Sequence, residues 1–239
     1  NIIGDGIYSE LVSEENIAPT DLFNIDILDL SAKTAKISGI KSQYCNKNGY
    51  NTETQKEDLP DTNYKINYKG ITDTLVIPYQ AEIDGEIYTI TEVDLTIWEI
   101  MPNAVKPGAN YPNIETIIYP NTITKIYSAV GAVNDSLLKK VVLSENLKEI
   151  PDYFFYNAEN LSTIKIPDSV ISIGAYAFSY CNDLTNITIP ISVIDMGYEV
   201  FYAWQTTQTI DVPFKEGDTP EGWSNGWKSS CNATINYLK

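Results

Sequence analysis

Residues 161–184 read LSTIKIPDSVISIGAYAFSYCNDL, and residues 184–204 repeat the same layout as LTNITIPISVIDMGYEVFYAW. The two stretches align on Pro167 and Pro190. On both sides of this pair, the position of the proline is occupied by Pro120, Ser144 and Pro213. The five positions are almost evenly spaced along the chain. A fixed interval of about 23 residues predicts a chain built from stacked repeats of one structural unit.

Apolar residues recur at fixed positions on both sides of this proline. One and three residues before it the sequence has Tyr119, Leu143, Ile166, Ile189 and Val212, and Ile117, Val141, Ile164, Ile187 and Ile210. Three, six and eleven residues after it stand Ile123, Leu147, Val170 and Val193, then Ile126, Ile150, Ile173 and Met196, then Phe155, Phe178 and Phe201. A single coil cannot bury these side chains alone, so we expect neighbouring coils to bury them by stacking.

The alternation before the proline predicts a short strand, and the crossover between coils requires neighbouring strands to pair in parallel. A second short strand is expected on the opposite wall, where the V-x-x-I segment lies. The sequence therefore predicts a mainly β repeat solenoid: a leucine-rich-repeat coil with a period of about 23 residues, a parallel sheet on the concave face, and a cap at each end.

The wording of residues 161–184 closely resembles the BspA-type leucine-rich repeat, and residues 184–204 match with Trp204 in place of the cysteine at position 181. Residues 75–78 (LVIP) and 84–93 (DGEIYTITEV) resemble the first coil of such proteins. The resemblance covers about residues 70–239. It implies a bacterial or protist surface or secreted protein linked to adhesion.

The domain boundaries follow from where the repeat is visible. Residues 1–69 are interpreted as an N-terminal tail, loosely held over residues 1–21, and a β cap in which residues 23–40 form one or two antiparallel strands. Residues 70–239 form the repeat solenoid, with an insertion near residues 100–113 and a C-terminal cap over residues 212–239. Exposed solenoid ends need such caps because unpaired strand edges invite aggregation.

Composition excludes several classes of function. Thirty-two acidic residues against 16 lysines, with no arginine, give a net charge of −16, which argues against nucleic acid and anionic membranes as partners. The chain has no histidine, so the common nucleophilic triads and imidazole metal sites are excluded. A carboxylate pair of the glycosidase type stays open, since its members come from distant positions. We predict no enzyme, no catalytic residue, no metal and no cofactor.

The predicted strands leave one candidate surface, formed by outward-facing side chains on the concave face. Ile118 and Val142 would form a small apolar patch, and Lys140 and Lys165 would anchor an acidic or polar partner. The candidate ligand-binding residues are Ile118, Lys140, Val142, Thr163, Lys165, Asn186, Thr188 and Asp211. The alternative is that this face is a solvated sheet with no partner.

Three functions stay open at this point. The first is a cell-surface or secreted binding module for an extracellular protein or glycan; the sequence shows no signal or anchor segment, as in a mature exported protein. The second is a structural spacer or self-associating element of a surface assembly. The third is a glycan-binding protein that uses Trp223 and Trp227, which otherwise close the last coil.

Overall fold

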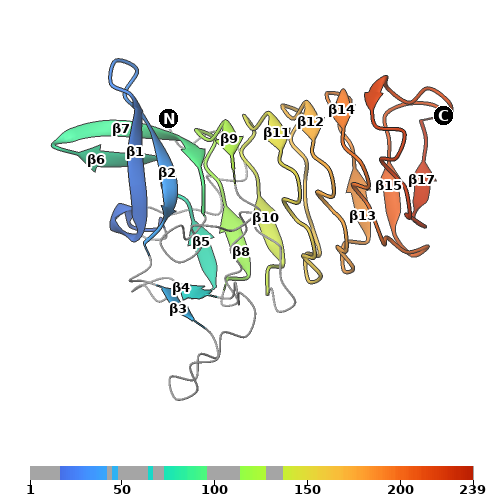
Figure 1. Cartoon of the computed structure of the whole chain (residues 1–239), viewed down its shortest axis with the longest axis horizontal. Helices are drawn as coiled ribbons and strands as arrows, with labels where there is room; N and C mark the ends of the chain where they lie inside the picture. Colours follow the sequence, from blue (N-terminus) through green and yellow to red (C-terminus); the bar gives the residue numbers. More distant parts are fainter. Residues whose placement is uncertain are drawn as a thin grey trace.

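The structure, a computed structural model, describes residues 17–41, 45–47, 64–66, 73–95, 114–127 and 137–238. The described chain is rich in short strands, and its one helical element is a 3-10 turn, η2 (Thr20–Leu22). Figure 1 shows the strands following one another along the long axis of the molecule, from the N-terminal sheet to the C-terminal coil. The predicted insertion near residues 100–113 lies outside the described residues.

The N-terminal part is a mixed sheet. β1 (Phe23–Asp29) and β2 (Thr34–Ile40) pair antiparallel, as the alternation in the sequence predicted. β7 (Glu86–Val93) then pairs parallel with β2 and antiparallel with β6 (Gln80–Ile83). A separate two-stranded ladder joins β3 (Cys45–Lys47) and β4 (Tyr64–Ile66).

Residues 17–22, just before β1, are packed, whereas residues 1–16 of the predicted tail lie outside the described residues. Ala18 and Leu22 are buried in the main core. Ile17 bridges Val76, and the Ala18 amide donates to the Val76 carbonyl at 2.9 Å. The physical reason is that Ile17, Ala18 and Leu22 supply apolar side chains where the first strand of the repeats offers a free edge.

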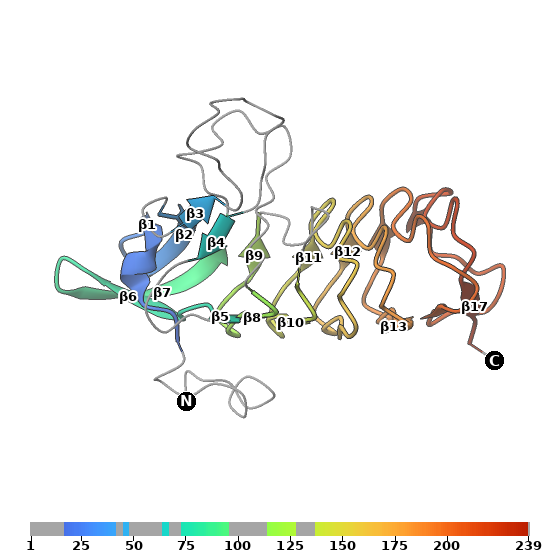
Figure 2. The ribbon, with the colours of Figure 1, turned by 90° about the horizontal axis from the view of Figure 1, so that it is seen from below.

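Two sets of parallel strands continue from this sheet on opposite walls of the repeats (Figures 1 and 2). On the first wall lie β5 (Thr74–Val76), β8 (Thr116–Ile118) and β10 (Lys140–Val142), and farther along β13 (Asn186–Thr188), β15 (Thr209–Asp211) and β17 (Thr234–Asn236). On the second wall lie β9 (Lys125–Ile126), β11 (Glu149–Ile150), β12 (Ser172–Ile173), β14 (Asp195–Met196) and β16 (Gly222–Trp223). The expected strands in the V-x-x-I segments are thus confirmed.

The N-terminal sheet and the repeats are joined through hydrogen-bonded strands, since β9 pairs parallel with β7. A cluster of side chains reinforces this joint: the Tyr127 hydroxyl donates to Glu92 at 2.6 Å. Two ammonium groups lie near the Tyr127 ring, Lys36 at 3.9 Å and Lys125 at 4.3 Å from its centroid. Cation–π contacts of this kind hold the first coil against the sheet.

The core lies between the two walls and contains the apolar columns read from the sequence. Ile117, Val141, Ile187 and Ile210 are buried, and Ile164 is half-buried against the same cluster. The phenylalanine column is stacked: the Phe178 ring lies 5.1 Å from Phe155 and 5.9 Å from Phe201, centroid to centroid. Repeat spacing therefore brings like side chains from neighbouring coils into direct contact.

Candidate functional site

The candidate surface is the outer side of the first wall, here called the strand face. In β13 and β15 the central isoleucine points into the core while its neighbours are exposed or half-exposed. The same alternation holds in β10, where Val141 is buried between Lys140 and Val142. Of the candidate residues, those exposed or partly exposed on this face are Lys140, Val142, Thr163, Lys165, Asn186, Thr188 and Asp211.

Ile118 is the exception, and its predicted place in an exposed patch is wrong. It is only 3% exposed and packs with Val76, Ile17 and Val142 in a second, smaller apolar cluster. The reason is that β5 and β8 carry apolar residues at their outward positions as well, so these side chains bury one another. Strand alternation correctly assigns the side on which Ile118 lies, but it does not say whether that side is covered.

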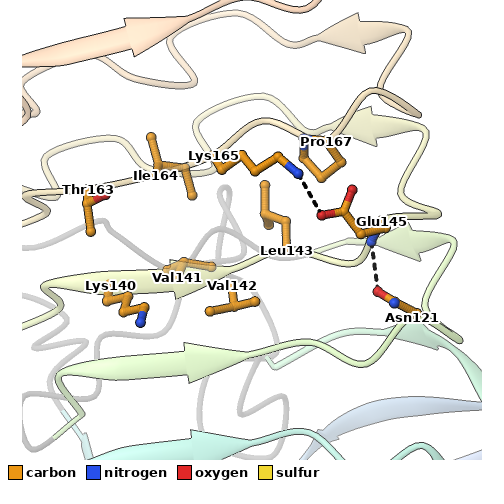
Figure 3. Close-up of a pocket in the computed structure, with 10 residues that line it drawn as sticks. All are labelled: Asn121, Lys140, Val141, Val142, Leu143, Glu145, Thr163, Ile164, Lys165 and Pro167. Carbon is orange, nitrogen blue, oxygen red and sulfur yellow. Dashed lines mark hydrogen bonds and ion pairs between the residues drawn. The ribbon is translucent and has the colours of Figure 1, made fainter. Parts of the chain in front are cut away.

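The strand face is interrupted in its middle. Between β10 and the coil at residues 161–167, pairing is reduced to one bridge, Lys140 to Thr163, supported by the Ser162 amide bonding to the Lys139 carbonyl at 3.1 Å. A hollow of ≈ 160 Å³ opens beside this bridge (Figure 3). It is lined by Asn121, Lys140, Val141, Val142, Leu143, Glu145, Thr163, Ile164, Lys165 and Pro167.

The hollow combines an apolar floor with charges on its rim. Lys165 forms an ion pair with Glu145 at 2.9 Å, and both side chains are well exposed, at 62% and 45%. The Asn121 side-chain oxygen accepts a bond from the Glu145 amide at 2.9 Å, which fixes the backbone of that rim (Figure 3). Exposed ion pairs contribute only about 0–1 kcal/mol to stability, so Lys165 can exchange its partner at little cost.

Lys140 stands on the opposite rim, and among the described residues it has no ion-pair partner. Its sequence neighbour Lys139 is paired instead, with Glu115 at 2.8 Å. In a chain of net charge −16 an uncommitted ammonium group beside an apolar hollow favours an anionic group of a partner. The volume is below the roughly 300–1,000 Å³ of small-molecule pockets, which favours one inserted side chain over a free ligand.

A second polar cluster lies farther along the strand face, centred on Asp211. Its carboxylate accepts bonds from Asn236 at 2.7 Å, from Asn186 at 3.0 Å and from Thr188 at 3.3 Å. Asn186 also donates to the Thr209 hydroxyl at 3.0 Å. The hydrogen bonds from Asn186, Asn236 and Thr188 hold the pKa of Asp211 below its ordinary value of 3.8. These contacts tie three neighbouring strands together across the exposed side of the sheet.

We expect Asp211→Asn to lower the free energy of unfolding at neutral pH by about 1–2 kcal/mol, because hydrogen bonds to a charged acceptor are lost. The folded-state pKa lies below the unfolded value, so the carboxylate stabilises the fold above pH 3.8. This contribution is lost as the pH falls through the folded pKa. Urea unfolding of both proteins should therefore give a difference at pH 7 that shrinks near pH 2.5. An equal difference at both pH values would contradict the assignment.

Trp223 and Trp227 close the last coil and present no ring for a sugar to stack on. They are 4% and 3% exposed, and their rings meet at 5.1 Å between centroids. The Trp223 indole N–H donates to the Val193 carbonyl at 3.1 Å. The expectation that these rings cover the end of the core is confirmed, and their use as a sugar-stacking pair is wrong because both are buried.

The thiol of Cys181 lies in the apolar core and has a structural role. Cys181 is fully buried, its thiol contacts the Phe155 carbonyl at 3.2 Å, and burial raises its pKa far above the ordinary value. Within the described ranges, no three His, Cys, Asp or Glu side chains are grouped closely enough to hold a metal ion. Within the same ranges, no helix is both long and apolar enough to cross a membrane.

Comparison with known proteins agrees with this architecture. The model of the BspA type leucine rich repeat region matches residues 109–217 in six copies. No curated protein matches the sequence of the chain significantly.

Solved structures resemble the chain at the level of the fold. A leucine-rich repeat protein from Bacteroides ovatus is 18% identical with a TM-score of 0.50; the match covers 82% of this chain and 40% of that protein. The T. pallidum leucine rich repeat protein is 18% identical with a TM-score of 0.52, over 83% of this chain and 73% of that one. The chain thus spans less than half the length of the Bacteroides protein.

Proposed function

We propose, on the premise that residues 109–217 belong to the BspA-type leucine-rich-repeat family, that the chain is a non-enzymatic module for binding an extracellular protein. The strand face is its binding surface, and the hollow between β10 and the coil at 161–167 is the centre of that surface. The single observation that carries the proposal is this hollow with Lys140 on its rim, a lysine that has no ion-pair partner among the residues the structure describes.

In this proposal the whole chain is one solenoid that keeps the repeat period of the sequence and has the strand face as its concave side. Residues 1–69 act as the N-terminal tail and cap, and residues 212–239 act as the C-terminal cap. The pairing of β16 and β17 with β14 and β15 supports a last coil that extends both walls before the chain ends the stack. The module works at the cell surface or after secretion, where a protein partner reaches the strand face.

The mode of binding follows from the chemistry of the rim. An apolar side chain of the partner enters between Val142 and Ile164, while a neighbouring carboxylate of the partner pairs with Lys140. Lys165 leaves Glu145 or bridges both carboxylates, since an exposed pair is held by little energy. The exposed Thr163 hydroxyl, together with Asn186, Thr188 and Asp211 beyond the hollow, supplies the polar outer part of the interface.

We expect the double variant Val142→Glu, Lys165→Glu to lose binding at least tenfold, because it places two carboxylates at an apolar hollow built for an anionic partner. The chain serves as bait against immobilised extracellular matrix proteins and polysaccharides. Lys148→Glu is the matched control, since Lys148 is also exposed but precedes β11 on the second wall.

The outcomes separate the open functions. A protein captured by the wild type and by Lys148→Glu, and lost by the folded double variant, supports the strand face. Capture that the double variant leaves unchanged contradicts it. If the wild type binds a polysaccharide and the double variant does not, the strand face binds a glycan and not a protein. If neither protein captures a partner, and the chain forms dimers in solution that both substitutions leave intact, the structural spacer is supported in place of the binding module.

A further inference from the structure

Six tyrosines form two rows along the turn segments that follow β11, β12 and β14, on neither of the two walls. The rows are Tyr153, Tyr176 and Tyr198, and Tyr156, Tyr180 and Tyr202. Ring centroids of neighbours within a row are 5.0 to 6.1 Å apart, and Tyr153 also meets Tyr156 at 5.6 Å, which joins the rows. We call this surface the tyrosine face.

The tyrosine face lies outside the core. The phenylalanines of the same turns are fully buried, whereas Tyr198 is 47% exposed and the other five tyrosines are partly exposed. Each ring therefore covers its neighbour on one side and presents its remaining surface to solvent. A contiguous row of accessible aromatic rings is uncommon on a protein surface and marks interaction sites.

The backbone at these positions adds a second observation. Tyr153, Tyr176 and Tyr180 have φ angles of 60°, 58° and 60°, in the left-handed region that costs a bulky residue about 1–2 kcal/mol. Hydrogen bonds between coils impose the conformation, for example from the Tyr176 amide to the Tyr198 carbonyl at 3.0 Å. Asparagine suits such positions better, and Asn157 fills one of them at 60°. Three of the six tyrosines thus occupy backbone positions that asparagine would fill at lower cost.

Carboxylates accompany the rings. Asp152, Glu159, Asp183 and Glu199 lie in the same turn segments, and residues 149–214 contain a single cation, Lys165, which belongs to the strand face. Hydrogen bonding to Glu199 raises the pKa of Tyr176 to about 12 and also raises the pKa of Tyr198. The phenols of Tyr176 and Tyr198 are therefore protonated at neutral pH, and the carboxylates supply negative charge to this face.

We propose that the tyrosine face binds an arginine-rich segment of a polypeptide. Guanidinium groups stack on aromatic rings and pair with carboxylates in a fixed planar geometry, which an ammonium group does not match. An extended segment places side chains of one side about 6.6 Å apart, close to the spacing of the rings. This surface is separate from the strand face, so an experiment can contradict one of the two proposed sites without affecting the other.

The test is binding of a nona-arginine peptide at physiological salt, with nona-lysine as the probe of equal charge. We expect nona-arginine to bind the wild type more tightly than nona-lysine. The double variant Tyr176→Asn, Tyr180→Asn should bind nona-arginine at least tenfold more weakly than the wild type does. The difference in affinity between nona-arginine and nona-lysine should also become smaller. Asparagine keeps the left-handed backbone, and thermal unfolding checks that the variant is folded.

A pair of single-charge variants separates a site from bulk attraction. Glu199→Gln removes a carboxylate from the tyrosine face, and Glu216→Gln removes an exposed one from a loop outside it. Weakening by the first alone supports the proposal. Equal effects of both, or nona-arginine binding that survives the loss of both tyrosines, would overturn it. A further result would also overturn the proposal. If the wild type binds a neutral oligosaccharide, and the tyrosine variant loses that binding but keeps nona-arginine binding, the occupant of the face is a glycan.

Discussion

Replacing Phe178 by alanine is expected to lower the free energy of unfolding by about 3–5 kcal/mol, because the ring is fully buried between two others. Phe155 and Phe201 each lose a stacked neighbour, and the backbone hydrogen bonds between coils prevent the coils from collapsing into the space. Since domains are stable by only about 5–15 kcal/mol, a loss of this size removes much of the total.

Chemical denaturation followed by circular dichroism measures the Phe178 effect. Phe178→Leu is the matched control, because it keeps an apolar side chain and should cost less than half as much. A loss below about 1 kcal/mol for the alanine variant would contradict the stacked column, since it would mean that the neighbouring rings close the space.

Replacing Gly174 by alanine is expected to cost about 3 kcal/mol for the opposite reason, because there is no room for a methyl group. A methyl carbon at Gly174 would overlap the backbone of Asp152, whose Cα would be 2.7 Å away. At Gly197, the equivalent position of the next coil, it would overlap Ala175, with its Cα at 2.6 Å. Backbone of a neighbouring coil cannot move aside without breaking its own hydrogen bonds.

Gly226 supplies the control for this prediction. A methyl group there meets the ring of Tyr198, a side chain that is 47% exposed and can shift toward solvent at lower cost than a backbone segment can. We therefore expect Gly226→Ala to cost less than a third of the loss at Gly174 or Gly197, measured by the same unfolding curves. Similar losses at all three positions would show that the close approach of neighbouring coils is not the cause.

The β-rich repeat fold was predictable because one physical requirement recurs in every coil. Each coil must bury the same apolar positions against its neighbours, so the pattern was visible in the sequence as columns around Pro167 and Pro190. The N-terminal sheet was only partly predictable. Its hairpin of β1 and β2 shows local alternation, but the parallel pairing of β2 with β7 joins segments that are far apart in the sequence and has no local signal.

The sequence predicted which side of the strands carries the candidate site, but it did not predict the shape of the site. Alternation assigned Lys140, Val142, Thr163 and Lys165 to the outward side of the strands, and the structure brings these four around one hollow. The hollow itself was not predictable, because Thr163 and Lys165 fit the repeat pattern although the ladder is interrupted there. Glu145 and Asn121 were not predicted as site residues because they lie in turns, and the alternation of the strands gives no information about turn residues.

The tyrosine face was also missed, although its signal was present. Tyrosines recur at positions 153, 176 and 198, and at 156, 180 and 202, with nearly the same spacing as the prolines of the repeat. A turn segment has no simple alternation, so sequence alone does not tell which of its aromatic residues point inward. Buried phenylalanines and accessible tyrosines stand side by side in these turns, as Phe155 and Tyr156 do, and residues of left-handed backbone such as Tyr153 and Tyr176 break any regular alternation.

The central claim is that the strand face around the hollow is the binding surface, and amide hydrogen exchange with a captured partner tests it most directly. We expect the partner to slow exchange in peptides covering residues 140–145 and 162–168. Peptides covering β12 and β14 on the second wall should exchange at unchanged rates. Protection confined to the second wall or to the terminal segments, with residues 140–145 and 162–168 unaffected, would contradict the claim.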